Sequence, residues 1–140
     1  MSEYTNQLVW TEGKKGLLSA AGLPDLEVAT PPEFGGPAGF WSPEQLFIAA
    51  ANSCVMATFL AIAANSKLPF KTYSGVATGR LEKLEGGLQI SEITIRVTLK
   101  VDQEKDRDRA QRVIMKAEEN CLVSRSMKTK VKVDPEILAG

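Results

Sequence analysis

The stretch S-P-E-Q-L-F-I-A-A-A-N-S-C-V-M-A-T-F-L-A-I-A-A, residues 42–64, decides how this chain folds. It opens with the signals of a helix start: Ser42 stands in the N-cap position, Pro43 in the first turn, and Gln45 completes a capping box. The apolar residues that follow are interrupted by neither glycine nor proline. The pattern therefore predicts one long helix that ends near Asn65.

The predicted helix is apolar around its whole circumference, so protein must surround it on every side. One small sheet cannot cover both sides of a helix of this length. Four alanines along it, Ala49, Ala50, Ala57 and Ala61, would let another helix approach closely. The simplest cover is a second copy of the chain, and we therefore expect a homodimer.

The composition is that of an ordinary globular protein. Seventeen basic residues balance 17 acidic ones, so the net charge does not favour a nucleic-acid partner or an anionic membrane. Residues 46–64 carry no charge and approach the length of a membrane span, but their polar members favour a soluble protein, and we expect no membrane span. The N-terminus shows no secretion signal, which predicts a cytoplasmic location. We expect one domain, residues 1–140.

The chain has two cysteines and no histidine, which narrows its chemistry. Without histidine there is no Ser-His-Asp triad, no histidine-paired cysteine and no histidine-based zinc site. Two cysteines alone make a poor metal site, so we expect no metal. Any reactive thiol would have to be activated by a cation other than imidazolium.

The remaining patterns predict an α+β fold. Apolar and polar residues alternate from Ile93 to Val101, which is typical of a strand with one buried face. The other predicted elements are strands at 4–11, 17–20 and 26–30, a Pro/Gly-rich loop at 31–41, a hairpin of residues 72–83 and 89–101 around Gly86-Gly87, a helix at 103–120 capped by Asp102, and a final strand at 129–133 that ends before Pro135.

Each cysteine has a plain structural explanation when it is considered alone. Cys54 lies too deep in the predicted helix for the helix dipole to activate it. Burial in apolar surroundings would raise its pKa and leave an inert thiol. Cys121 ends the apolar stripe of the second helix, on the core side, and a helix C-terminus suits a thiolate even less.

Several motifs together resemble the OsmC/Ohr family of organic hydroperoxide reductases. A glycine turn, the Pro/Gly-rich loop, S-P-E-Q-L-F-I-A-A-A-N-S-C and A-E-E-N-C-L-V-S-R-S follow one another in the order of that family. The family's mark is an N-P-E-Q-L-like helix start with a cysteine ten residues after the glutamate, the spacing of Glu44 and Cys54. Cys121 matches the family's second cysteine, near the C-terminus.

The resemblance implies an OsmC-like fold, in which an intertwined homodimer packs long buried central helices against antiparallel sheets. It also implies an enzyme of the oxidative stress response that reduces organic and fatty-acid hydroperoxides. Cys54 would be the peroxidatic thiol, and Cys121 would resolve the resulting sulfenic acid as a disulfide. An external dithiol reductant, protein or small thiol, would reopen the disulfide, and no cofactor is implied.

The sequence departs from the family at the catalytic cation. Family peroxidases stabilise the thiolate with an arginine, but this chain has no arginine before Arg80. The glycine turn reads G-K-K-G, so Lys14 is the candidate for this role, with Lys15 beside it; a solvated turn lysine is the alternative. Lysine lacks the planar fork with which arginine binds carboxylate and orients a peroxide. Arg125 is a further available cation.

Glu44 is the family's carboxylate position. Ten residues along a helix span about 15 Å, so Glu44 cannot touch Cys54 of its own helix. If Glu44 serves the thiol site, Glu44 of the partner subunit would supply the carboxylate. The alternative is an ordinary acid that favours the first turn of a helix.

Phe34, Phe40 and Trp41 stand on the long loop before the helix and are candidates for substrate binding, with packing as the alternative. Because the arginine is missing, a second hypothesis is a non-catalytic family member that binds a small apolar ligand at the dimer interface. A third is a redox sensor that uses the same cysteine pair. A cation within reach of Cys54 would favour catalysis, and an apolar shell without one would favour binding.

Overall fold

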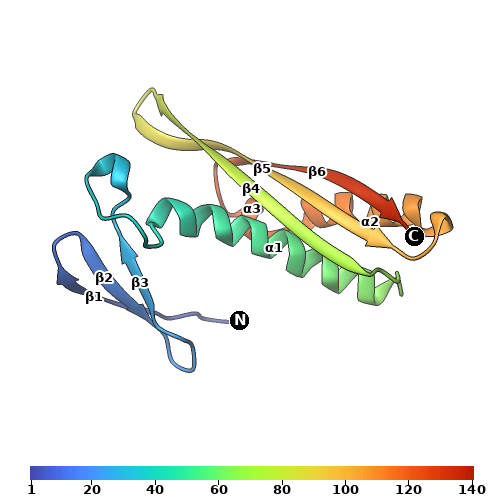
Figure 1. Cartoon of the computed structure of the whole chain (residues 1–140), viewed down its shortest axis with the longest axis horizontal. Helices are drawn as coiled ribbons and strands as arrows, with labels where there is room; N and C mark the ends of the chain where they lie inside the picture. The colour runs from blue at the N-terminus through green and yellow to red at the C-terminus, as the bar shows by residue number, and fades with distance from the viewer. The chain divides into compact units, whose positions relative to one another are not determined.

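The computed structural model describes residues 1–140, and the chain divides into two compact units, Met1–Phe47 and Ile48–Gly140 (Figure 1). The boundary falls within α1, Pro43–Asn65, so one continuous helix begins in the first unit and continues in the second. Strands and helices come in groups along the chain, in the α+β manner that the sequence predicts.

The first unit contains a three-stranded antiparallel sheet in the order β1-β2-β3, which confirms the predicted strands. Gly13, with φ +52°, closes the turn between β1 and β2, in a backbone region that favours glycine. Every residue of β1 is exposed in the single chain. The strands are β1 Gln7–Glu12, β2 Lys15–Ser19 and β3 Leu26–Ala29.

The Pro/Gly-rich loop is a compact structure built around one turn of 3₁₀ helix, η1 Pro32–Phe34. The turn ends at Gly35, whose φ of +86° is left-handed. A Cβ added at Gly36 would overlap the backbone carbonyl of Thr30, so this close approach requires glycine. The loop returns the chain to the start of α1.

The helix α1 begins and ends where the sequence predicts. The Gln45 N–H donates to the Ser42 hydroxyl at 3.1 Å, which is the N-cap hydrogen bond of the predicted capping box. Only four residues of α1 are buried in the single chain: Ala51, Val55, Phe59 and Ala63. By length and composition alone α1 could cross a membrane, a property that it shares with core helices of soluble proteins.

The second unit is built on a three-stranded sheet in the order β4-β5-β6. The predicted hairpin is confirmed, with Gly86 at φ +98° in its turn. The predicted alternation in β5 is confirmed as well, because its five apolar members from Ile93 to Val101 are at most 1% exposed. The strands are β4 Thr72–Leu84, β5 Gly87–Val101 and β6 Lys130–Ala139.

The second helix, α2 Arg107–Asn120, begins later than predicted. A turn of 3₁₀ helix, η2 Glu104–Asp106, precedes it. Asp102 therefore does not cap the helix; its carboxylate lies 3.3 Å from Lys71 Nζ instead. The predicted apolar stripe is confirmed, since all of its members are buried: Ala110, Val113, Ile114, Ala117 and Cys121.

The final strand continues past Pro135, where the sequence predicts it to end. β6 pairs with β5 alone and is therefore an edge strand. An edge strand tolerates a residue without an N–H, because alternate N–H groups point away from the sheet. β6 runs parallel to β5, so this sheet is mixed rather than wholly antiparallel.

The core of the second unit depends on the buried face of β5. Leu99 is 0% exposed, whereas Leu88 on the same strand is 60% exposed. We expect Leu99→Ala to lower the free energy of unfolding by about 2–5 kcal/mol, because the truncation leaves a cavity. The matched control Leu88→Ala should cost less than about 0.5 kcal/mol. Urea unfolding at one fixed protein concentration measures both, and equal losses would contradict this description of the core.

Candidate thiol site

The second unit brings the two cysteines together as free thiols. Cys54 lies in the middle of α1 and is half-buried, whereas Cys121 follows the last residue of α2 and is 0% exposed. The Cys121 side chain lies close enough to the Cys54 sulfur to lower its pKa. The packing of the two helices thus joins residues that are distant in the sequence.

A four-residue helix completes the site, and the sequence analysis did not predict it. This helix, α3 Leu122–Arg125, follows Cys121. The extended backbone of Cys121, with ψ 112°, separates α3 from α2. The first N–H groups of a helix have no partner within the helix. In α3, those of Leu122 and Val123 lower the pKa of Cys54.

Hydrogen-bond donors decide the ionisation of Cys54. Burial raises the pKa of Cys54, but the Val123 N–H, the Cys121 thiol, the Thr58 hydroxyl and the Leu122 N–H together outweigh burial and lower the pKa below its ordinary value. The position of Cys54 in its helix, taken alone, indicates burial and therefore an inert thiol, and only the resemblance to a family implies a reactive one. The donors come from a segment far along the chain, which no local pattern reveals.

Thr58 is a weaker partner of the Cys54 thiol. Its hydroxyl oxygen lies 3.9 Å from the Cys54 sulfur, although it also contributes to lowering the pKa. The single hydroxyl proton has a better acceptor in the Cys54 carbonyl, at 2.8 Å. We therefore assign the thiolate-stabilising role chiefly to the α3 backbone and the Cys121 thiol.

The ionisation of Cys121 is opposite to that of Cys54. Burial raises the pKa of Cys121, and the negative charge on Cys54 raises it further, while the hydroxyl and N–H of Ser124 oppose the rise. When the pair loses one proton, Cys54 therefore loses it more readily than Cys121. Loss of that proton would provide a nucleophilic thiolate with a neutral thiol beside it.

Two of the three predicted cations, Lys14 and Lys15, lie in the first unit and have partners there, whereas Arg125 ends α3 in the second unit. The Lys14 ammonium donates to the Phe34 carbonyl at 3.2 Å. Lys15 lies 3.7 Å from the carboxylates of both Glu12 and Glu27, and 4.4 Å from the centroid of the Phe40 ring. Within this unit, the two turn lysines thus tie the glycine turn to the sheet and to the loop.

Glu44 lies in the first turn of α1, as its position in the sequence predicts. One of its carboxylate oxygens, Oε1, is buried and has no hydrogen-bond partner in the single chain. A buried carboxylate oxygen without a donor is costly. The favourable position of an acid in the first turn of a helix therefore does not by itself explain why this oxygen of Glu44 is buried without a partner.

Two of the three predicted substrate-binding aromatics line one pocket in the first unit. Phe40 and Trp41, with Gly39 and Gln45, enclose about 330 Å³ beside the start of α1. Trp41 is held there because its carbonyl accepts the Ala29 N–H at 2.9 Å. Phe34 is not a lining residue of this pocket, and its carbonyl binds Lys14.

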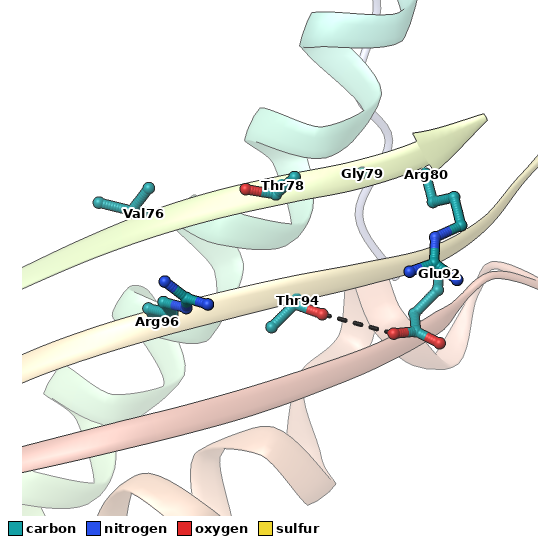
Figure 2. Close-up of a pocket in the computed structure, with 7 residues that line it drawn as sticks. All are labelled: Val76, Thr78, Gly79, Arg80, Glu92, Thr94 and Arg96. Atoms are coloured by element: carbon teal, nitrogen blue, oxygen red, sulfur yellow. Dashed lines mark hydrogen bonds between the residues drawn. The ribbon is translucent and has the colours of Figure 1, made fainter.

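A separate polar groove of about 270 Å³ lies on β4 and β5 (Figure 2). Arg80 and Arg96 stand at its two ends, with Thr78 and Thr94 between them, and the Thr94 hydroxyl lies 3.5 Å from a Glu92 carboxylate oxygen. These residues alternate along the strands with those that face the core. The groove contains no thiol and is not part of the candidate thiol site.

Solved structures with the same fold are known from several bacteria. An OsmC-like protein of unknown function from Vibrio cholerae is 22% identical, with a TM-score of 0.86, and the match covers 97% of this chain and 100% of that chain. The organic hydroperoxide resistance protein of Elizabethkingia anophelis is 18% identical, with a TM-score of 0.76 and coverage of 100% and 98%. That of Bacillus subtilis is 24% identical, with a TM-score of 0.67 and coverage of 96% and 98%.

At these identities the structural likeness establishes the fold. No curated protein matches the sequence. The family described as OsmC-like protein matches residues 36–136, which is more than half of the chain and includes both cysteines. The chain therefore belongs to the OsmC-like protein family, and its structural neighbours include organic hydroperoxide resistance proteins.

Proposed function

We propose that this protein is a two-cysteine thiol peroxidase that reduces organic hydroperoxides, including those of fatty acids, to alcohols. The observation that carries the proposal is the opposite ionisation of two adjacent thiols, with the pKa of Cys54 lowered and that of Cys121 raised. A peroxidatic thiol must be a thiolate, and a resolving thiol must stay close to it. Membership of a family with organic hydroperoxide resistance proteins supports the same function.

The reaction proceeds in two steps. The Cys54 thiolate attacks the distal oxygen of the hydroperoxide; an S–O bond forms, the O–O bond breaks, and the released alkoxide takes a proton and leaves as the alcohol. Cys121 then attacks the sulfenic sulfur; the S–S bond forms and water leaves with the sulfenic oxygen and the Cys121 proton. A cytoplasmic dithiol restores both thiols by exchange.

Backbone amides perform part of the work that an arginine performs in other family peroxidases. The N–H groups of Leu122 and Val123 are fixed by the backbone, so they do not have to reorient when charge develops on the sulfur. Neutral donors lower the thiol pKa without supplying a full positive charge. In this chain the activation of Cys54 therefore depends on the geometry of α3.

A second copy of the chain would complete the molecule. One face of α1 is uncovered in the single chain, where Met56 and Leu60 are 39% and 40% exposed, and the neighbouring Ala57 and Ala61 are exposed as well. We propose that the same face of a second copy covers it in a homodimer. In that assembly a donor from the partner subunit would meet the unpaired oxygen of Glu44.

A second candidate function is the binding of a small apolar ligand without catalysis. It is favoured by one observation: the groups of the second unit that act on Cys54 are neutral donors, and no cation is among them. The pocket beside Phe40 and Trp41 offers an apolar lining for such a ligand. The two functions differ in whether a hydroperoxide consumes the thiols.

Reaction with cumene hydroperoxide tests the peroxidase directly. We expect the reduced protein to lose both thiols within seconds and to form an intramolecular disulfide, measured by thiol titration and intact mass. Cys54→Ser should abolish the reaction, because it removes the nucleophile. Cys121→Ser should stop at the sulfenic acid, because it removes the resolving thiol. Thiols that persist for many minutes in the wild-type protein would favour ligand binding instead.

The Cys121 thiol contributes to the lowering of the Cys54 pKa. Cys121→Ala removes this donor, so the pKa of Cys54 should rise, and the pH midpoint of Cys54 alkylation by iodoacetamide should move upward. Cys121→Ser keeps a hydroxyl donor and serves as the matched control, with a smaller shift. An unchanged midpoint in Cys121→Ala would show that the second thiol has no part in stabilising the first.

The uncovered face of α1 predicts the oligomeric state. Ala57→Glu places a charge in the proposed helix–helix contact, so we expect the mass in sedimentation velocity to fall from that of a dimer to that of a monomer. Thr78→Glu, on the sheet groove of Figure 2, introduces the same charge elsewhere and should leave the dimer intact. A wild-type protein that sediments as a monomer would contradict the proposed assembly.

A further inference from the structure

Two buried hydroxyls in the second unit have no hydrogen-bond partner. They are the phenolic oxygen of Tyr73 and the hydroxyl oxygen of Ser124. Native proteins pair nearly all of their buried polar atoms, and a buried hydroxyl left unpaired destabilises the fold. Two such groups in one unit suggest that they have a partner in another state of the protein.

Both hydroxyls belong to the surroundings of Cys121. Ser124 lies three residues after Cys121 in α3, and its hydroxyl and N–H lower the pKa of Cys121, although the hydroxyl forms no hydrogen bond in the resting protein. Tyr73 reaches the site from β4, and its ring packs on Phe59 of α1 with centroids 5.1 Å apart. Burial and then the charge of Cys121 raise the pKa of Tyr73 to about 12, so the phenol keeps its proton and can donate it.

The reaction itself creates the missing acceptor. Cys121 is 0% exposed and carries its proton in the resting protein. To attack the sulfenic sulfur it must become a thiolate, which has no water around it to stabilise the charge. The titratable groups that interact with Cys121 are Cys54 from α1 and Tyr73 from β4. Once Cys54 is a sulfenic acid, the groups of these elements that can stabilise the negative charge of the Cys121 thiolate are hydroxyl donors.

We propose that Ser124, assisted by Tyr73, donates hydrogen bonds to the Cys121 thiolate and so speeds the resolving step. The proposal rests on the two-cysteine function proposed above. In the step, the Cys121 sulfur is oxidised as the S–S bond forms, and the sulfenic S–O bond breaks. The leaving hydroxide combines with the proton that Cys121 released, which gives water. Both hydroxyls are paired only while the thiolate exists.

The resolving step can be measured without a peroxide. Methyl methanethiosulfonate converts the Cys54 thiolate to a methyl mixed disulfide and releases methanesulfinate. The Cys121 thiolate then displaces methanethiolate and forms the intramolecular disulfide. Rapid quenching followed by intact mass gives the rates of both steps for the wild-type protein, Ser124→Ala, Tyr73→Phe and the double variant.

We expect Ser124→Ala to slow the second step about tenfold, because it removes a hydrogen bond to a charged group, and to move the pH midpoint of that step upward. Tyr73→Phe should have a smaller effect in the same direction, and Ser124→Thr should restore the rate. The first step should change less than about twofold, since neither hydroxyl acts on Cys54. Ser126→Ala is the matched control, because that α3-flanking hydroxyl donates to the Leu122 carbonyl at 2.8 Å and not to a thiol.

Each outcome shows whether the two hydroxyls act in the resolving step or only support the structure. If the double variant resolves at the wild-type rate with an unchanged pH midpoint, the hydroxyls have no such role. If both steps slow equally, the hydroxyls only support the structure, which also overturns the inference. If the hydroxyl dependence is found while cumene hydroperoxide leaves the wild-type thiols intact, the inference holds and the peroxidase function fails.

Discussion

The packing of two helices against one apolar face of a sheet is the constraint on which the site depends. The buried side chains of β5 and β6 point to the same face, and α2 lies against these strands. α1 lies against β4, where a Cβ at Gly75 or Gly79 would meet Asn52 or Ile48. Because both helices share this support, the middle of α1 lies beside the end of α2, where Cys54 and Cys121 stand.

The same constraint explains how a chain without histidine can lower the pKa of a thiol. Once α2 ends at Cys121, the short α3 directs its unpaired N–H groups toward Cys54. Burial would by itself disfavour a thiolate at either cysteine. The donors are distributed unequally, so the negative charge is stabilised on one sulfur and the proton is kept on the other. Backbone geometry, rather than a single cationic side chain, sets this difference within the second unit.

Much of the fold could be predicted from the sequence because its signals are local. The cap at Ser42, the alternation from Ile93 to Val101 and the stripe that ends at Cys121 each report their element directly. The failures have physical reasons. Asp102 looks like a cap but pairs with Lys71, and Pro135 looks like a terminator but lies on an edge strand.

The site was less predictable than the fold. The two cysteines could be identified as site residues from the resemblance of their motifs to a family. The directions of their pKa shifts could not be predicted from the sequence. Val123 and Ser124 carry no motif of their own, and a helix of four residues leaves no periodic signal. The unpaired hydroxyl of Tyr73 appears only when β4, α1 and α2 are packed together.

The most direct test measures the ionisation of both thiols in one wild-type sample. Reduced protein is alkylated over a range of pH with a light reagent, unfolded, and alkylated to completion with an isotopically heavy one, and the peptides of Cys54 and Cys121 are then quantified. The account predicts a pH midpoint below that of a free cysteine for Cys54 and above it for Cys121. Equal midpoints, or a more acidic Cys121, would contradict it.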